Sequence, residues 1–229
     1  MPTSLNSGPD RGPLIRKLES IAALSDDERR ALMELPMSAR DIRADQDIVR
    51  EGDRPSQCCL VIDGFLARYK LTPRGKRQIM AFHTPGDNPD LQSLHLRTMD
   101  HSLGTLSPGR VAFIPHEPLR ALCTGFPRLA GLFWRDTLID AAIFREWMVG
   151  IGRRSAYSRI AHVFCEVLVR LEAVGLTQDR SCAFPITQSE LGDALGLSTV
   201  HVNRVLQELR ADDLIMLGTA GWSCTTGRR

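Results

Sequence analysis

Apolar residues recur at helical spacing through residues 186–214, ITQSELGDALGLSTVHVNRVLQELRADDL, and predict two consecutive helices. At the start of the first helix, Thr187 and Glu190 stand three residues apart, where each side chain can satisfy a free backbone donor of the other. Gly196 permits the left-handed backbone of a tight helix exit, and Ser198 is a suitable cap for the second helix. The stretch therefore predicts a helix-turn-helix.

The second of these helices has two contrasting faces. Its expected inward positions are all apolar, namely Val202, Val205, Leu206 and Leu209. At about 100° per residue, the outward face, its flanks and its N-terminal end carry Ser198, Thr199, Val200, His201, Asn203, Arg204 and Gln207. Arginine can make two hydrogen bonds to guanine, asparagine and glutamine can do so to adenine, and valine can touch a thymine methyl. This face therefore predicts base reading in the major groove of double-stranded DNA.

Phosphate contacts are expected where the first helix begins, from Thr187, Gln188 and Ser189, because helix N-termini attract anions. One alternative is an ordinary helical hairpin with a solvated polar face, since two helices joined by a glycine turn are common. Another is a ligand- or redox-sensing module that acts through protein contacts without binding DNA. The chain from Gly150 onward carries 9 basic and 8 acidic residues, and this near-neutral balance favours that alternative.

The N-terminal half has a different pattern. Residues 14–33 predict two short helices, with Ser25 as the cap of the second, after a loose tail at residues 1–13. From Asp41 to Pro115, short apolar runs alternate with glycine and proline turns; the runs are QDIVR, CCLVI, FLARYKL, QIMAFH, HSLGTL and RVAFI. This pattern predicts a β sandwich or small roll. The basic turn at residues 74–77 is expected to be a solvated hairpin tip.

Residues 127–149 predict a long helix whose apolar residues cover more than one stripe. They are Leu129, Leu132, Phe133, Trp134, Leu138, Ile139, Ala142, Ile143, Phe144, Trp147 and Met148. Such a helix must be buried on two sides, which its own roll and the same helix of a second chain would provide. The alternative is the central helix of a monomer. Gly150 and Gly152 follow and are expected to form a hinge.

Behind the helix-turn-helix, residues 158–174 predict a further amphipathic helix. Its expected buried positions are Ile160, Val163, Phe164, Val167, Leu168 and Leu171. The tail at residues 214–227, LIMLGTAGWSCTTG, predicts two short strands around Gly218 to Gly221, which would form a wing.

The runs ITQSELGDALGLS and VNRVLQELR closely resemble bacterial regulators related to the cyclic-AMP receptor protein and the fumarate-nitrate regulator, and a weaker resemblance extends over nearly the whole chain. It implies an α+β fold with an N-terminal β jelly-roll sensor domain (1–126), a dimerisation helix and hinge (127–152) and a C-terminal winged helix-turn-helix (153–229). It also implies a homodimer on a pseudo-palindromic DNA site, with RNA polymerase as a further partner.

The resemblance also assigns individual positions. It implies that Arg204 reads a base. Val200 stands where many members carry a base-reading glutamate, and Thr199 stands where the cyclic-AMP type carries a second arginine. The preferred DNA sequence is therefore expected to differ from theirs.

In the cyclic-nucleotide members a Gly-Glu pair meets the ribose and an Arg-Ser pair meets the phosphate. The corresponding positions here are Asp90-Leu91 and His101-Ser102, which mark a possible effector pocket. Leucine cannot accept a ribose hydrogen bond, and a histidine is mostly neutral at pH 7. Three of the four positions depart from the pattern, so cyclic AMP is not expected, although a different ligand in the same cavity remains open.

No cofactor or metal is expected. The six cysteines show no C-x-x-C spacing and none precedes Cys58, which argues against an iron–sulfur cluster. Cys58 and Cys59 are adjacent on a strand, so one should point inward and one outward, and packing is preferred over redox sensing. A haem ligand among the histidines remains an alternative; the candidates are His83, His95, His101 and His116.

Other functional classes find little support. Asp100, His101 and Ser102 contain triad residue types, but neighbours on a strand face opposite ways, so no enzyme is expected. The net charge is only +2, so affinity for DNA must come from local placement of arginines. There is no signal-peptide pattern and no apolar stretch of about 18 residues, which favours a reduced, cytoplasmic protein without a membrane partner.

Overall fold

The computed structural model describes residues 10–178, 181–218 and 221–224. In chain order the elements of the N-terminal part are α1 (Gly12–Ile21), α2 (Asp26–Glu34), β1 (Ser38–Ile42), β2 (Asp47–Val49), β3 (Gln57–Asp63), β4 (Leu66–Leu71), β5 (Arg77–His83), the 3-10 turn η1 (Leu91–Leu94), β6 (Ser102–Thr105), β7 (Gly109–Pro115), α3 (His116–Gly125) and α4 (Pro127–Arg153). Those of the C-terminal part are α5 (Ala156–Ala173), β8 (Ala183–Phe184), α6 (Gln188–Leu195), α7 (Thr199–Ala211), β9 (Ile215–Gly218) and β10 (Gly221–Cys224).

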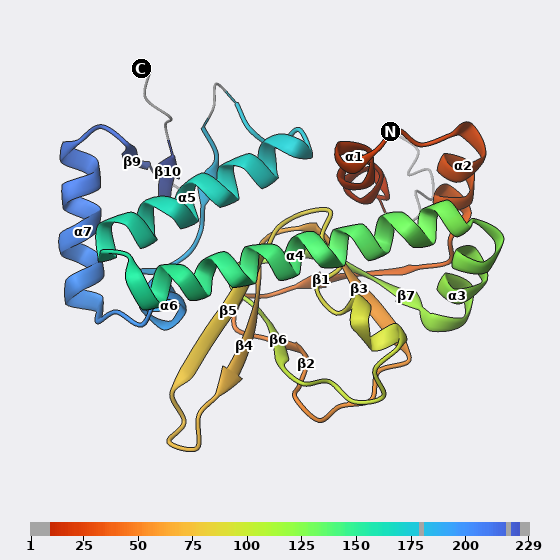
Figure 1. Ribbon diagram of the computed structural model, residues 1–229, viewed down its shortest axis with the longest axis horizontal. Helices are drawn as coiled ribbons and strands as arrows, with labels where there is room; N and C mark the ends of the chain where they lie inside the picture. Colours follow the sequence, from red (N-terminus) through yellow and green to blue (C-terminus); the bar gives the residue numbers. More distant parts are fainter. Residues whose placement is uncertain (1–9, 179–180, 219–220, 225–229) are drawn as a thin grey trace, which may run out of the picture.

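The molecule is arranged along α4. Figure 1 shows α1, α2 and α3 at one end of this helix, α6 and α7 at the other, and the strands β2 to β6 along one side. The two predicted N-terminal helices are confirmed, and Ser25 forms a reciprocal capping box with Glu28. Helix α1 begins at Gly12, so the end of the expected loose tail is helical; residues 1–9 lie outside the described part of the chain.

The strands form the predicted roll from two antiparallel sheets. One has the order β1-β7-β3 and the other β2-β6-β4-β5, and an apolar cluster around Val61, Leu66, Leu103 and Val111 fills the space between them. Strand β1 was not predicted. It pairs with β7 while most of its side chains stay partly or fully exposed, so it lacks the apolar run by which the other strands are recognised.

The long helix α4 extends further than the sequence predicted. It passes through Gly150 and Gly152 to Arg153, and the backbone of Arg154 still donates to the carbonyl of Gly150 (3.0 Å). The two glycines expected as a hinge are therefore helical here; a helix interior tolerates glycine at a cost of about 1 kcal/mol. The sequence also missed α3, which packs on α4 and β7.

The C-terminal part has the predicted order of helices. All six expected positions of α5 are buried, and α5 packs against α6 and α7. The two wing strands β9 and β10 are confirmed, and β8, which was not predicted, pairs with β10 to complete a three-stranded sheet. The rest of the predicted wing, residues 219–220 and 225–227, lies outside the described residues.

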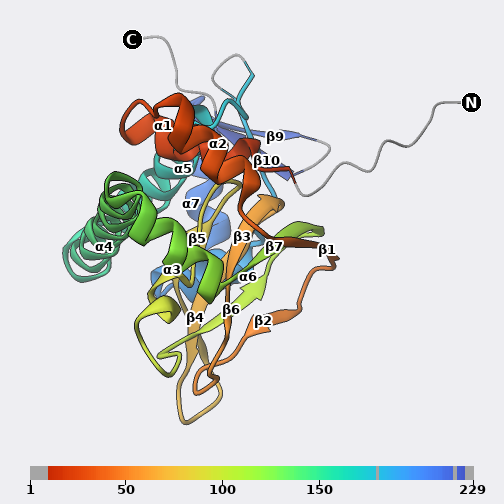
Figure 2. The ribbon, with the colours of Figure 1, turned by 90° about the vertical axis from the view of Figure 1, so that its right-hand side faces the viewer.

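The roll and the C-terminal helices share one hydrophobic cluster. Phe82 of β5 meets Trp147 of α4 edge to face, with ring centroids 5.4 Å apart. The same cluster continues through Phe164 of α5 to Leu191 of α6 and Leu206 of α7. The helix-turn-helix is thus packed against its own sensor roll, and Figure 2 shows α6 beside the strands of the roll.

Candidate nucleic-acid interface and sensor cavity

The first helix of the helix-turn-helix begins as predicted. The backbone of Glu190 donates to the Thr187 hydroxyl (3.2 Å), and the Glu190 carboxylate accepts from the Thr187 backbone (2.6 Å). Ile186, which should pack over this cap, is buried, as is Leu191. At the other end Gly196 has φ +66°, the left-handed geometry that a side chain would disfavour. These local signals fix both ends of α6.

Helix α7 is also fixed by its own sequence. The Ser198 hydroxyl accepts from the backbone of His201 (3.3 Å), which caps the helix. All four predicted inward positions are buried in the shared cluster. This packing leaves the opposite face of α7 to solvent.

The outward face carries the predicted base-reading residues. Val200 is 82% exposed, an unusual setting for a valine, and Arg204 and Gln207 are exposed on the same face. Thr199 is exposed as well, and His201 is half-buried at the flank. These positions present two hydrogen-bonding side chains and one methyl-bearing side chain to a partner, which is the chemistry that base edges require.

The expected phosphate-binding residues lie beside this face. The Asn203 amide donates to the Gln188 side chain (3.2 Å), so α7 and the start of α6 form one surface. Thr187 and Ser189 are exposed there and Gln188 is partly exposed. Arg204 lies 3.7 Å from the Glu208 carboxylate, and because both are well exposed, this pair can exchange for another partner. The surface thus combines a helix N-terminus with adjustable polar groups.

The roll holds α6 in place through polar contacts as well as the shared cluster. The Arg77 guanidinium of β5 donates to Asp193 (2.9 Å), and the Gln78 side chain donates to the carbonyl of Ala194 (3.0 Å). The basic turn expected to be a solvated hairpin tip therefore ends in a residue, Arg77, that contacts α6. Residues 74–76 are exposed.

The possible effector-pocket residues lie in the roll but mostly face the protein. The carboxyl of Asp90 accepts a hydrogen bond from the backbone of Cys59 (2.7 Å) and is buried. Burial raises the pKa of Asp90 to about 7, against the opposing effects of the Cys59 hydrogen bond and of Arg68. Leu91 is buried beside it. We call these two residues together with the pair His101-Ser102 the cassette. The half formed by Asp90-Leu91 offers no polar group to a ribose.

The second half is likewise occupied by protein contacts. The Ser102 hydroxyl accepts from the backbone of Glu51 (3.0 Å). His101 lies within 2.8 Å of Asp100 and 3.2 Å of the Gln92 amide, and burial lowers its pKa below the usual value. The expectation that Asp100 and His101 point apart was wrong, because both precede β6, which begins at Ser102. Ser102 contacts neither of them, so the three do not form a catalytic triad.

His101 does face a cavity. A hollow of about 280 Å³ lies between the roll and α4, and Arg68, His101, Asp140 and Phe144 are among its lining residues. Asp90 and Ser102 do not line it. Leu91 lines a neighbouring pocket. Each of the two expected pairs therefore has one residue that reaches a cavity, Leu91 in the first pair and His101 in the second.

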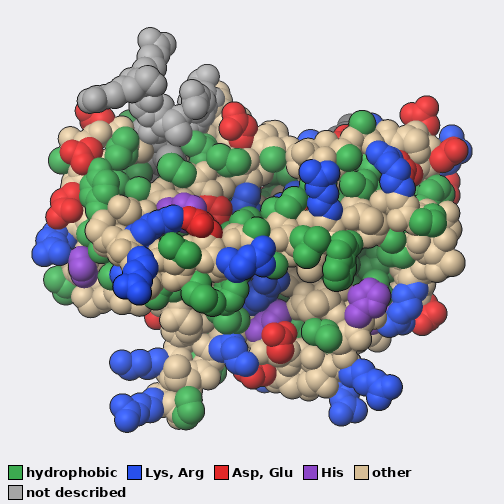
Figure 3. Space-filling model, viewed as in Figure 1, with side chains coloured by type: hydrophobic (Ala, Val, Ile, Leu, Met, Phe, Trp, Pro, Cys, Tyr) green, Lys and Arg blue, Asp and Glu red, His purple; other side chains and the backbone are tan. Residues whose placement is uncertain are grey.

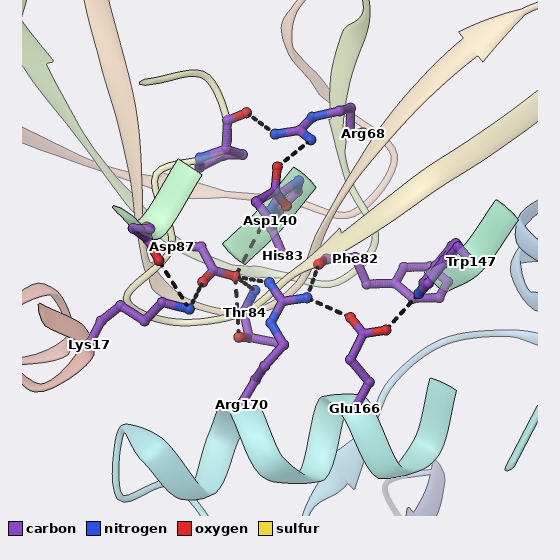
Figure 4. A network of polar contacts seen from close by, with 12 residues as sticks. Lys17, Arg68, Phe82, His83, Thr84, Asp87, Asp140, Trp147, Glu166 and Arg170 are labelled. Atoms are coloured by element: carbon purple, nitrogen blue, oxygen red, sulfur yellow. Dashed lines mark hydrogen bonds and ion pairs between the residues drawn. The ribbon is translucent and has the colours of Figure 1, made fainter. Parts of the chain in front are cut away.

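A buried polar cluster joins the roll to both long helices (Figure 4). At its centre, the Asp87 carboxylate contacts the Arg170 guanidinium of α5 and the Lys17 ammonium of α1 (3.0 Å). Arg170 also donates to Glu166 (2.9 Å) and to the carbonyl of Phe82 (2.8 Å). Burial alone would raise the pKa of Asp87, but Arg170 and Lys17 hold it well below its usual value.

The same cluster reaches α4. Arg68 of the roll donates to Asp140 (2.7 Å) and to the carbonyl of Pro89 (2.6 Å). His83 is buried beside them, and burial lowers its pKa to about 3, so its ring is neutral at pH 7. None of these contacts was expected, and the ion pairs that join separate parts of the chain, Lys17–Asp87, Arg68–Asp140 and Asp87–Arg170, link residues 70 or more positions apart in the sequence. They tie the DNA-binding half to the sensor half.

The adjacent cysteines and His116 are packed into the protein interior. Cys58 and Cys59 do alternate across β3, but both are fully buried, because helices cover the outer face of the sheet as well. Burial raises the pKa of Cys58 to about 12, which removes the reactive thiolate at neutral pH. His116 hydrogen-bonds Ser93 (3.0 Å). Across the described ranges, no three histidine, cysteine or acidic side chains converge into a metal-binding group.

This combination of parts defines a class. A β roll joined by a long helix to a winged helix-turn-helix, with an exposed polar face on the second helix, is the architecture of a two-domain DNA-binding regulator. Residues 39–125 match the family of the cyclic nucleotide-binding domain, and residues 158–222 match that of the Crp-like helix-turn-helix domain. The chain belongs to the Crp/Fnr family of transcription regulators, and it is not an enzyme.

Individual relatives agree with this assignment. The transcriptional activator protein FnrA of Stutzerimonas stutzeri is 25% identical over 203 residues, covering 89% of this chain and 80% of that protein. The nitrogen fixation regulation protein FixK of Bradyrhizobium diazoefficiens is 27% identical over 180 residues, covering 78% of this chain and 74% of that protein. The solved structure of FixK2 from Bradyrhizobium japonicum superposes with a TM-score of 0.75 at 25% identity, covering 85% of this chain and 94% of the other.

These findings confirm the α+β fold and DNA binding through the helix-turn-helix as the chain's function. The alternative of a sensing module that does not bind DNA is not supported. None of the helices in the described segments is both long and apolar enough to cross a membrane.

Proposed function

We propose that this regulator binds a pseudo-palindromic DNA site as a homodimer, with one α7 helix in each of two successive major grooves. The observation that carries the base-reading part is the exposed face of α7, where Val200, Arg204 and Gln207 lie together. Thr187, Gln188, Ser189 and the wing strands would contact the flanking phosphates, because a helix N-terminus offers free backbone donors. RNA polymerase is the partner that a transcription regulator of this type would recruit or exclude.

An apolar stripe on α4 supports the dimer. One side of the helix is packed on its own roll, and the buried residues there include Leu129, Leu132, Phe133 and Trp147. On the other side, large apolar side chains stay exposed along the length of the helix; they include Trp134 (66%), Leu138 (47%), Phe144 (38%), Met148 (61%) and Ile151 (39%). Two such stripes bury each other when two α4 helices pair around a twofold axis.

We propose that the chain divides functionally into a sensor part at residues 1–126, a pairing helix at 127–152 and a DNA-binding part at 153–229. The two long packed elements meet near Arg154, where α4 ends and α5 begins at Ala156. Because both glycines before Arg154 are helical here, bending at that point would require the last turn of α4 to unwind.

Control by cyclic AMP is disfavoured in this proposal. A cyclic nucleotide would need acceptors for its ribose and a cation for its phosphate, whereas Leu91 is apolar and His101 is held by Asp100 and Gln92. An iron–sulfur cluster is disfavoured as well, because the described cysteines do not converge. No cofactor is part of the proposed mechanism.

Selection of random duplex DNA by the purified chain, with no ligand added, tests the proposal. We expect a palindrome with half-sites about ten base pairs apart, because two recognition helices lie about one helical turn apart in such dimers. Val200→Glu should then shift the preferred base at one position of each half-site while total affinity stays similar. Enrichment of single, unrepeated half-sites would contradict the dimer, and an unchanged preference in the variant would contradict the placement of Val200.

A further inference from the structure

A second pocket of the sensor half lies outside the cassette. It measures about 550 Å³ and opens between η1, α3 and the N-terminal half of α4. Its walls are mainly apolar, and they include Leu91, Leu94, Leu96, Ala130, Phe133 and Trp134. This volume lies within the usual range for small-molecule sites, about 300–1,000 Å³. In Figure 3, hydrophobic side chains gather along this face of α4.

The pocket has one permanently charged lining residue, the cation Arg120. No aspartate or glutamate is among its lining residues. The Arg120 guanidinium spans from α3 to η1, where it donates to the carbonyl of Leu94 (2.8 Å). Its second partner, Glu117 (3.0 Å), is 88% exposed, so water weakens that ion pair and a competing anion can replace it. The pocket therefore combines an apolar body with a cationic rim.

We propose that this pocket binds an anionic amphiphile, namely a carboxylic acid with an apolar body, as the effector of the regulator. The carboxylate would pair with Arg120, because a guanidinium can donate two parallel hydrogen bonds to a carboxylate. The apolar body would lie between Leu94, Phe133 and Trp134. The inference rests on the proposed function for its regulatory meaning only, because the binding itself needs no DNA.

The site also has a mechanical connection to the DNA-binding half. Phe133 and Trp134 belong to α4, and two to four turns further along the same helix Ile143 and Trp147 contact the cluster shared with α5, α6 and α7. Trp134 belongs at the same time to the apolar stripe proposed to pair two chains. A molecule seated here thus touches both the pairing surface and the helix that carries the DNA-binding domain.

Titration calorimetry with the full chain and decanoate, kept below the concentration at which it forms micelles, tests the site. We expect saturable binding of one decanoate per chain. Arg120→Gln should weaken it about tenfold, the loss expected for one charge-assisted pair. 1-Decanol, which has the same length without the charge, should bind equally to both proteins. Arg110→Gln is the matched control, because Arg110 is a similarly exposed arginine paired with Asp41 at the other end of the roll.

A second variant tests binding in the apolar cavity separately from pairing with Arg120. Ala130→Trp places a large ring in the cavity and should abolish binding of both decanoate and decanol, while the circular-dichroism spectrum stays that of the native chain. Absence of saturable decanoate binding, or equal affinity in Arg120→Gln, would overturn the proposal. It is overturned as well if Ala130→Trp splits a dimer in sedimentation without changing decanoate affinity, since a second chain then fills the pocket. Duplex selection is read separately, so its failure leaves the calorimetric result intact.

Discussion

The outward face of α7 and the polar cluster between the roll and α5 contain similar residues in opposite settings. On α7, Arg204 and Gln207 are exposed, and the nearest acidic partner of Arg204 is itself half-exposed. In the cluster, Arg170 and Asp87 are less than a tenth exposed and contact each other, a lysine and a backbone carbonyl. Polar groups left to water are available to a partner molecule, whereas polar groups paired in the interior hold two parts of the chain together.

Polar groups of the cassette in the roll are also paired within the protein, like those of the buried cluster. Asp90 and Ser102 each accept a hydrogen bond from a neighbouring backbone amide. The two side chains expected from the family resemblance to face a ligand are therefore engaged by the protein's own backbone. We therefore expect substitutions in the buried cluster and the cassette to change stability, and substitutions on the exposed face of α7 to change DNA binding.

Removal of the Arg170 charge should have the largest effect. Arg170→Met keeps most of the side-chain volume but leaves Asp87 and Glu166 buried without their shared cation. Breaking a buried ion pair in this way costs about 3–5 kcal/mol, so the free energy of unfolding in urea should fall by that amount. Hydrogen exchange along α5 should rise at the same time, because the cluster joins this helix to the roll.

An exposed ion pair provides the control. Arg30→Met removes a cation from α2 whose side chain is 66% exposed and pairs with Asp27, which is also well exposed. We expect a loss below about 1 kcal/mol there. If Arg170→Met and Arg30→Met lower the free energy of unfolding by the same amount, the buried cluster contributes no more to stability than a surface pair. The contrast between the two settings is then wrong.

Protonation of Asp90 should have the second largest effect. Its pKa rises from 3.8 to about 7 on folding because of burial, so the folded chain binds a proton that the unfolded chain releases. Its contribution to stability is complete below the unfolded pKa and is lost as the pH rises through about 7. Between about pH 4 and pH 8, the free energy of unfolding of wild type should therefore fall by about 2–4 kcal/mol relative to that of Asp90→Asn.

Taking the difference between the two proteins is essential to this test. Asp87 and Asp140 have pKa values lowered on folding and contribute stability with the opposite pH dependence, but they are present in both proteins. Urea titrations of wild type and Asp90→Asn at each pH give the difference directly. A difference that stays constant with pH would mean that Asp90 is ionised in the folded chain and that its surroundings are more polar than the buried position indicates.

Those elements whose signals are local could be predicted from the sequence. The caps at Ser25, Thr187 and Ser198 and the left-handed Gly196 depend on residues within a few positions of one another, and all are present. The alternation of short apolar runs likewise predicted most strands of the roll. Local signals were therefore sufficient to predict the helix-turn-helix and the surface that α7 exposes.

What could not be predicted depends on distant partners. Strand β1 is mostly exposed and is defined by pairing with β7, and the polar cluster joins Lys17 of α1 and Arg170 of α5 to Asp87 in the loop after β5. The glycines after Val149 gave a strong local signal for a hinge, yet the helix continues through them. The pocket beside Arg120 has no sequence signal at all, because α3, η1 and α4 meet only in the fold.

The smallest expected effect concerns the exposed side of the comparison. Arg204→Ala should leave stability almost unchanged, because the side chain is 68% exposed and its pair with Glu208 is weak. Affinity for the selected duplex should fall by about 1–3 kcal/mol, and preference at one base pair of each half-site should relax. Competition titrations with duplexes altered at single positions measure both quantities.

Arg210→Ala on the same helix separates base reading from charge. Arg210 is exposed in the last turn of α7, away from the N-terminal half that we propose enters the groove. Its loss should weaken binding to all duplexes alike and reduce the salt dependence by the equivalent of about one phosphate contact. If Arg204→Ala behaves in the same way, with an unchanged order of preference among the altered duplexes, Arg204 contacts the backbone. Exposure on α7 would then indicate where DNA lies but not which of its side chains reads the bases.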